Sequence, residues 1–252
     1  MSSSALFKIV LEASWKGDEE QDAALADATV YLQSLSSSDT STQLTYRGGW
    51  DRGVLHLLAL CFPPYEQAAS FLSLVIERGR ESCGTTALIS LADTEGNTPL
   101  HVFAAYCPNL SLTKMVLREY PPPLAALNID GETPLNLAES NYGSTSERVI
   151  FFRAASAAFN ANNFVAFEAL CGGSSPYLSR EIGKQAKALR AAVTICLNRQ
   201  EEMPSALNSV QTGVALSLLE RVRDFGRVGN SSDLLRRVLE YVGPYARPCD
   251  EN

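Results

Sequence analysis

The stretch Asp93-Thr94-Glu95-Gly96-Asn97-Thr98-Pro99-Leu100-His101 decides how this chain folds, because parts of it recur at regular distances. Thr133-Pro134-Leu135-Asn136 repeats its second half 35 residues later, and Gly53-Val54-Leu55-His56 is a weaker copy 45 residues earlier. A period in the thirties, with a turn signal before each copy, is typical of arrays of stacked helix pairs. Such arrays present extended binding surfaces, so recognition rather than catalysis is expected.

The residues of the best copy predict a turn followed by two packed helices. Gly96 suits a turn position with positive φ, Thr98 is placed to cap a helix, and Pro99 takes the first helical position, where its missing N–H costs nothing. A second helix is expected after the turn at Pro108-Asn109. Its apolar residues fall on one face at helical spacing: Leu112, Val116 and Leu117.

The neighbouring copies keep this pattern less fully. The later copy retains Gly131 and Thr133-Pro134-Leu135, but Asn136 replaces the histidine. In the earlier copy Val54 stands at the proline position, while Leu55-His56 matches the best copy. The surplus residues are expected in surface loops, because loop insertions cost little stability. They are placed in Tyr120 to Pro123, in the turn from Phe62 to Tyr65 and in Arg78 to Ala92. The polar stretch Ser36 to Thr42 is expected to be a separate, flexible surface loop.

Outside the three copies the pattern is still helical. Leu6 to Ala13 and Ala23 to Leu35 are expected to form an N-terminal capping pair. Downstream, two interpretations remain open: one long helix from Ser146 to Asn160, or a degenerate further pair that ends at Gly172-Gly173. Three more helical patterns follow, at residues 179–197, 205–225 and 231–242.

These motifs resemble the ankyrin repeat, most closely from Asp93 to Ala138. The resemblance implies an all-α fold: an ankyrin-like helix-pair solenoid with a C-terminal helical region. The array would span residues 1–172, with the capping pair, repeats near 50–92, 93–127 and 128–155, and a degenerate unit to 172; residues 173–252 would form the C-terminal region. The residues that match the repeat motif are Leu55, His56, Gly96, Thr98, Pro99, Leu100, His101, Gly131, Thr133, Pro134 and Leu135.

The ankyrin resemblance also implies a function, which is a non-catalytic protein–protein interaction module or scaffold. Its partner would be another protein, bound along the concave surface made by the finger turns and the first helices. The residues that match that surface are Asp51, Arg52, Thr94, Glu95, Tyr106, Ile129, Asp130, Glu132, Asn141 and Tyr142. Exposed tyrosines among them are good anchors for a protein partner.

The charge distribution indicates what kind of partner to expect. The chain has a net charge of −7, but residues 1–145 hold 8 Lys+Arg against 17 Asp+Glu, whereas residues 146–252 hold 13 against 11. Nucleic acid is therefore not expected on the acidic repeat half, because phosphate binding depends on Lys and Arg. A basic segment of another protein fits better.

No enzymatic function, metal or cofactor is expected. The two histidines, His56 and His101, occupy equivalent repeat positions, which favours a structural role. The six cysteines include no C-x-x-C pair, so reduced, buried thiols are expected rather than a zinc site or disulfides. No phosphate-binding loop or nucleophile elbow is found. No run of 18 apolar residues and no export leader is visible, so a cytoplasmic or nuclear location without membrane contact is expected.

The C-terminal part suggests an alternative function. Residues 216–225 and 231–242 are faintly similar to SOCS-box or F-box helices, which recruit ubiquitin-ligase subunits, although the Leu-Pro steps of those boxes are absent. The alternative is thus a substrate adaptor whose C-terminal helices recruit a ubiquitin-ligase component. The arginines of this region are interpreted as a solvated face in preference to a site for an acidic partner, and a nucleic-acid patch is the least favoured alternative.

Overall fold

The computed structural model describes residues 4–13, 18–61, 66–107, 109–181 and 184. These residues are helical with connecting turns, and they contain no β-strand. The all-α prediction is therefore confirmed for this part of the chain. The predicted turn from Phe62 to Tyr65 and the predicted C-terminal helices from residue 185 onward, with the arginine cluster and the box-like segments, lie outside the described residues.

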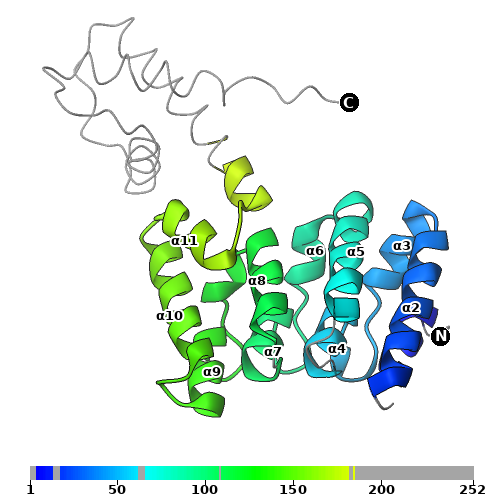
Figure 1. The fold of residues 1–252 in the computed structure, drawn as a ribbon, viewed down its shortest axis with the longest axis horizontal. Helices are drawn as coiled ribbons and strands as arrows, with labels where there is room; N and C mark the ends of the chain where they lie inside the picture. The colour runs from blue at the N-terminus through cyan, green and yellow to red at the C-terminus, as the bar shows by residue number, and fades with distance from the viewer. Residues whose placement is uncertain (1–3, 14–17, 62–65, 108, 182–183, 185–252) are drawn as a thin grey trace, which may run out of the picture. The chain divides into compact units, whose positions relative to one another are not determined.

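Two compact units divide the chain: residues up to 156 together with 170–172, and residues 157–169 together with those from 173 on. In the first unit the helices form two rows (Figure 1). Consecutive contacts join the helices of the first row, which are α1 (Ala5–Ala13), α4 (Val54–Cys61), α7 (Pro99–Ala105) and α9 (Pro134–Tyr142). The second row contains α2 (Asp18–Ser34), α5 (Glu66–Ser82) and α8 (Leu110–Glu119).

The core lies between these rows. Phe71 of α5 and Phe103 of α7 are fully buried, as are Val116 and Leu117 of α8. The small Ala104 is also fully buried, which lets the second helix of its pair approach closely. The two helices predicted for the best copy are therefore confirmed. Two helices, α1 and α2, also form at the N-terminus as predicted, although α2 begins at Asp18 instead of Ala23.

The caps and turns of the repeat follow the sequence prediction. Thr98 and Thr133 are the N-cap residues of α7 and α9, and a proline follows each one at the first helical position. Gly96 and Gly131 both have a φ of 75°, in the left-handed region that favours glycine. Local turn and capping chemistry therefore sets where α7 and α9 begin.

Three expected loops contain short helices instead. The polar stretch from Ser36 was predicted to be a flexible loop, which is wrong, because α3 (Ser37–Leu44) forms there. Its Thr40 and Leu44 are fully buried, and α3 contacts α5. Within the expected loop from Arg78, α5 continues to Ser82 and α6 (Thr85–Ile89) buries Leu88 and Ile89. The proline-rich connection holds the 3-10 helix η2 (Pro122–Ala125).

The alternatives after the third copy are decided by α10 (Glu147–Asn160), which is one long helix. The second unit, taken by itself, includes most of α11 (Phe164–Cys171), and residues 176–181 are helical. Its Phe159 and Phe167 rings lie 5.8 Å apart, centroid to centroid, and Ser175 N–H donates to Glu168 Oε1 (3.1 Å). None of the described helices is long and apolar enough to cross a membrane.

Candidate protein-recognition surface

Three turns with the same backbone hydrogen bonds precede α4, α7 and α9. In each, the first N–H donates to the carbonyl four residues on: Gly48 to Arg52 (2.9 Å), Asp93 to Asn97 (2.9 Å) and Asn128 to Glu132 (3.0 Å). We call residues 48–52, 93–97 and 128–132 the finger turns. Their fourth position has positive φ, and it is occupied by Asp51, Gly96 and Gly131. The hydrogen bonds thus fix a residue-by-residue equivalence between the three copies.

Backbone hydrogen bonds also join each finger turn to the next. Thr94 N–H donates to Trp50 O, and Ile129 N–H donates to Glu95 O, both at 3.0 Å. The same position donates and the same position accepts in both cases. The three finger turns are therefore held in a regular row, and equivalent side chains follow one another along it.

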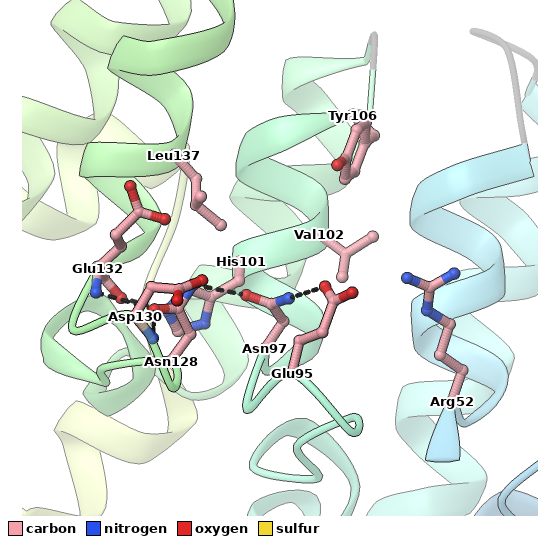
Figure 2. Close-up of a pocket in the computed structure, with 10 residues that line it drawn as sticks. All are labelled: Arg52, Glu95, Asn97, His101, Val102, Tyr106, Asn128, Asp130, Glu132 and Leu137. Atoms are coloured by element: carbon pink, nitrogen blue, oxygen red, sulfur yellow. Dashed lines mark hydrogen bonds between the residues drawn. The ribbon is translucent and has the colours of Figure 1, made fainter. Parts of the chain in front are cut away.

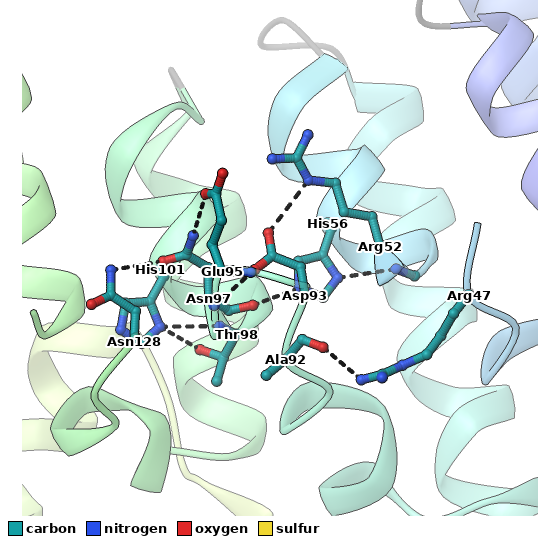
Figure 3. A network of polar contacts seen from close by, with 11 residues as sticks. Arg47, Arg52, His56, Ala92, Asp93, Glu95, Asn97, Thr98, His101 and Asn128 are labelled. Atoms are coloured by element: carbon teal, nitrogen blue, oxygen red, sulfur yellow. Dashed lines mark hydrogen bonds and ion pairs between the residues drawn. The ribbon is translucent and has the colours of Figure 1, made fainter. Parts of the chain in front are cut away.

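The two histidines, at the starts of α4 and α7, strengthen this row by joining successive copies (Figure 3). His56 Nδ1 accepts from Gly53 N–H (3.2 Å), and its Nε2 donates to Asn97 O (2.9 Å) in the next finger turn. His101 repeats this with Thr98 N–H (3.1 Å) and Glu132 O (3.1 Å). Each imidazole therefore caps its own helix and holds the following turn.

Both rings are fully buried, and burial lowers the pKa of His56 and of His101 below the ordinary value of 6.5. The hydrogen bond from Nε2 to a carbonyl opposes this shift, but desolvation is the larger effect. The neutral tautomer with its proton on Nε2 is the one that these contacts require. Neither ring has a nitrogen available for a ligand.

Two polar side chains stabilise the finger turns internally. Asp93, which is buried, accepts from Glu95 N–H (3.0 Å) and Asn97 N–H (2.9 Å), and Arg52 Nε lies 3.4 Å from its other oxygen. Asn128 accepts from the corresponding N–H groups of the third turn and donates to Asn97 Oδ1 (3.1 Å). The Asp93 carboxylate therefore binds groups of the fold itself: two backbone N–H groups and Arg52.

A groove of about 100 Å³ opens between the second and third finger turns and the first-row helices (Figure 2). We call it the finger groove. Its lining residues are Arg52, Glu95, Asn97, His101, Val102, Tyr106, Asn128, Asp130, Glu132 and Leu137. Glu95 and Asp130 are exposed, and Tyr106 is 57% exposed. The groove therefore combines an acidic rim with an aromatic and aliphatic wall.

The structure brings five of the ten expected partner-binding residues to this groove: Arg52, Glu95, Tyr106, Asp130 and Glu132. Asp51, Thr94 and Ile129 lie on the finger turns outside it, and Ile129 is 71% exposed. Asn141 and Tyr142 lie at the end of α9 and have structural contacts. Asn141 Nδ2 donates to Ala105 O (3.3 Å), and the Tyr142 hydroxyl accepts from the buried Arg148 (3.1 Å).

Sequence reasoning missed Trp50, which is 67% exposed on the first finger turn. Its φ is 64°, so both Trp50 and Asp51 are in the left-handed region. The alignment with Glu95 in the best copy was a signal that could have identified it. Leu137 was missed because the sequence pattern marks apolar helical residues as core, and Val102, which also lines the groove, is a core residue with 2% exposure.

A second depression of about 230 Å³ lies on the second helix row, where Arg80 pairs with the buried Glu119 at 2.7 Å. Its lining mixes both charge signs with Ile76 and Met115. Among the described residues, no group of three or more His, Cys, Asp or Glu side chains could hold a metal ion. In comparisons with known proteins, no family model, no curated protein and no solved structure matches this chain.

Proposed function

We propose that the chain is a non-catalytic protein-recognition module, built as an ankyrin-like array, which binds a basic segment of another protein at the finger groove. The repeated bond pattern of the three finger turns, with a histidine bridge between successive turns, supports the array. The two rows of helices behind the turns are arranged as such an array requires. Both histidines are engaged through both ring nitrogens, which argues against a role in proton transfer.

The acidic rim of the groove is the observation that carries the proposed partner class. The carboxylates of Glu95, Asp130 and Glu132 line the groove, whereas its one arginine, Arg52, is paired with Asp93. A Lys or Arg side chain could place its aliphatic stem on Tyr106 and its charged group among the carboxylates. Complementary charge of this kind increases both association rate and specificity.

Charge reversal tests the proposal. The variant carrying Glu95→Lys, Asp130→Lys and Glu132→Lys is compared with the wild type on an array of basic, neutral and acidic peptides at 50 and 500 mM salt. The wild type should retain basic peptides at low salt, and the variant should lose them.

A matched control reverses Glu12, Glu20 and Asp27, which are exposed on α1 and α2 and change the net charge by the same amount. This control variant should bind like the wild type. Equal binding of basic peptides by the wild type and the groove variant would exclude the groove as the recognition site. An equal loss in both variants would show that only the overall charge matters.

A further inference from the structure

The third position of each finger turn carries a different kind of side chain in each copy. By the shared hydrogen bonds, Trp50, Glu95 and Asp130 are equivalent, and all three are exposed. Along the row, the surface therefore presents first an indole and then two carboxylates. Because the two ends of the row differ, a partner can bind in only one orientation, which a uniform acidic patch would not require.

Trp50 has a left-handed backbone conformation, which is rarely adopted by tryptophan. The left-handed region is unfavourable for a non-glycine residue, and for an aromatic one it is a genuine outlier. Two hydrogen bonds enforce the conformation: Asp51 N–H donates to Gly48 O (3.2 Å), and Trp50 O accepts from Thr94 N–H. Tryptophan is also the residue type most enriched at the energetic centres of protein interfaces. An exposed indole on a constrained turn is thus well suited to anchor a partner.

The charges at the first finger turn are already paired within the fold, whereas the other two turns present exposed carboxylates. The guanidinium of Arg52 lies 5.9 Å from the centroid of the Trp50 ring, and Arg47 lies 3.5 Å from Asp51. An apolar residue of the partner can therefore pack on the indole without a charge conflict. At the second and third turns, Glu95 and Asp130 favour Lys or Arg.

The spacing of the turns sets the spacing of the partner's residues. Packed helices such as α4, α7 and α9 lie about 8–10 Å apart. A polyproline II segment has three residues per turn and advances about 3.1 Å per residue, so residues three apart point to the same side and lie roughly 9 Å apart.

We propose that the partner is a segment in the polyproline II conformation, with an apolar residue on Trp50, followed at intervals of three residues by two basic residues opposite Glu95 and Asp130. This inference rests on the proposed function and specifies its ligand. The segment has the form apolar-x-x-basic-x-x-basic, read in whichever chain direction matches the row. Indole packing then selects the segment, and the two ion pairs fix its register.

Labelled synthetic peptides test this register by fluorescence anisotropy with the whole chain at 50 mM salt. The probe is Leu-Ala-Ser-Arg-Ala-Ser-Arg, made in both chain directions with blocked ends. A permuted peptide of the same composition places Leu and both Arg side by side, and a third peptide replaces Leu with Arg. We expect one direction of the probe to bind at least fivefold tighter than the permuted peptide, and no gain from the third arginine.

Trp50→Gly is the diagnostic variant, because glycine accepts the positive φ and should keep the turn folded. It should abolish the advantage of the probe over the permuted peptide, whereas Val30→Ala, at a similarly exposed site on α2, should leave it unchanged. Equal binding of probe and permuted peptide, both dependent on Glu95 and Asp130, would overturn the register and leave the proposed function intact. If no basic peptide binds the wild type, both proposals fail.

Discussion

Replacing His101 with asparagine would separate its two structural roles. The third copy already has an asparagine at the equivalent position: Asn136 Oδ1 accepts from Thr133 N–H at 2.9 Å. Asparagine at position 101 should therefore still cap α7. It is too short to reach Glu132 O, so the bridge to the third finger turn should be lost.

The expected loss of stability follows from these contacts. One hydrogen bond contributes about 0.5–1.5 kcal/mol, and a smaller side chain at a fully buried site leaves a void that costs about 1 kcal/mol more. His101→Asn should therefore lower the free energy of unfolding by about 2 kcal/mol. His101→Ala also removes the capping acceptor, which adds about 1 kcal/mol.

Urea unfolding followed by circular dichroism at pH 8 measures these changes. With a slope of about 2–3 kcal/mol per molar urea, His101→Asn should lower the midpoint by roughly 0.7–1 M. Asn136→Ala is the matched control, because it removes only a cap and should cost about 1 kcal/mol. A cost of less than about 0.5 kcal/mol for His101→Asn would show that the bridge from His101 to Glu132 contributes nothing to stability.

Three further outcomes follow from the same structure. Gly96→Ala should lower the free energy of unfolding by about 1 kcal/mol more than Gly131→Ala, as measured by thermal or urea unfolding. Both glycines have a φ of 75°, but a Cβ at Gly96 would lie 2.9 Å from a backbone nitrogen of the next turn, whereas a Cβ at Gly131 would have no atom within 4 Å. Arg80→Ala should lower the free energy of unfolding by about 1–3 kcal/mol, because it leaves the buried Glu119 carboxylate without its partner. Arg153→Ala breaks an exposed pair and should lower it by less than about 1 kcal/mol. Similar losses in the two variants would contradict the importance of burial. Because burial lowers the pKa of His56 and His101, the unfolded chain takes up protons at a higher pH than the folded chain, so the stability that the two imidazoles contribute is complete above pH 6.5 and is lost as the pH falls below it. The urea midpoint should therefore fall more between pH 7.5 and 5.5 in the wild type than in a variant with asparagine at both positions, which reports the effect of the carboxylates alone. An equal fall in both proteins would contradict this.

Much of the repeat could be predicted because its signals are local. A turn glycine, a capping threonine and a proline act within a few residues, and Gly96, Thr98 and Pro99 all do what their positions predict. The equivalence of the two histidines also indicated a structural role. Their acceptors, the carbonyls of Asn97 and Glu132, could not be predicted, because they lie 41 and 31 residues further along the chain.

The failures share a physical cause, which is that tertiary contacts override local composition. Ser36 to Thr42 is polar enough for a loop, but burial of Thr40 against the core makes it a helix. Trp50 adopts a left-handed conformation that its residue type disfavours, so only its equivalence to Glu95 could have revealed it. The finger groove itself combines residues from three copies, and its apolar wall is indistinguishable in sequence from the core.

The exchange of histidine for asparagine at position 136 affects how the first unit should open. Each imidazole reaches forward along the chain, so breaking one bridge releases the turn that follows it. Asn136 makes its capping contacts without such a reach, so that α10 is joined to the row by packing and by the side chains of Arg148 and Arg153 instead of by a histidine bridge. Cooperative units in stacked proteins separate where neighbour coupling is weakest. Amide protons of residues 147–156 in α10 should therefore exchange with solvent through partial opening before those of α4 and α7, so that the unit opens first at this end.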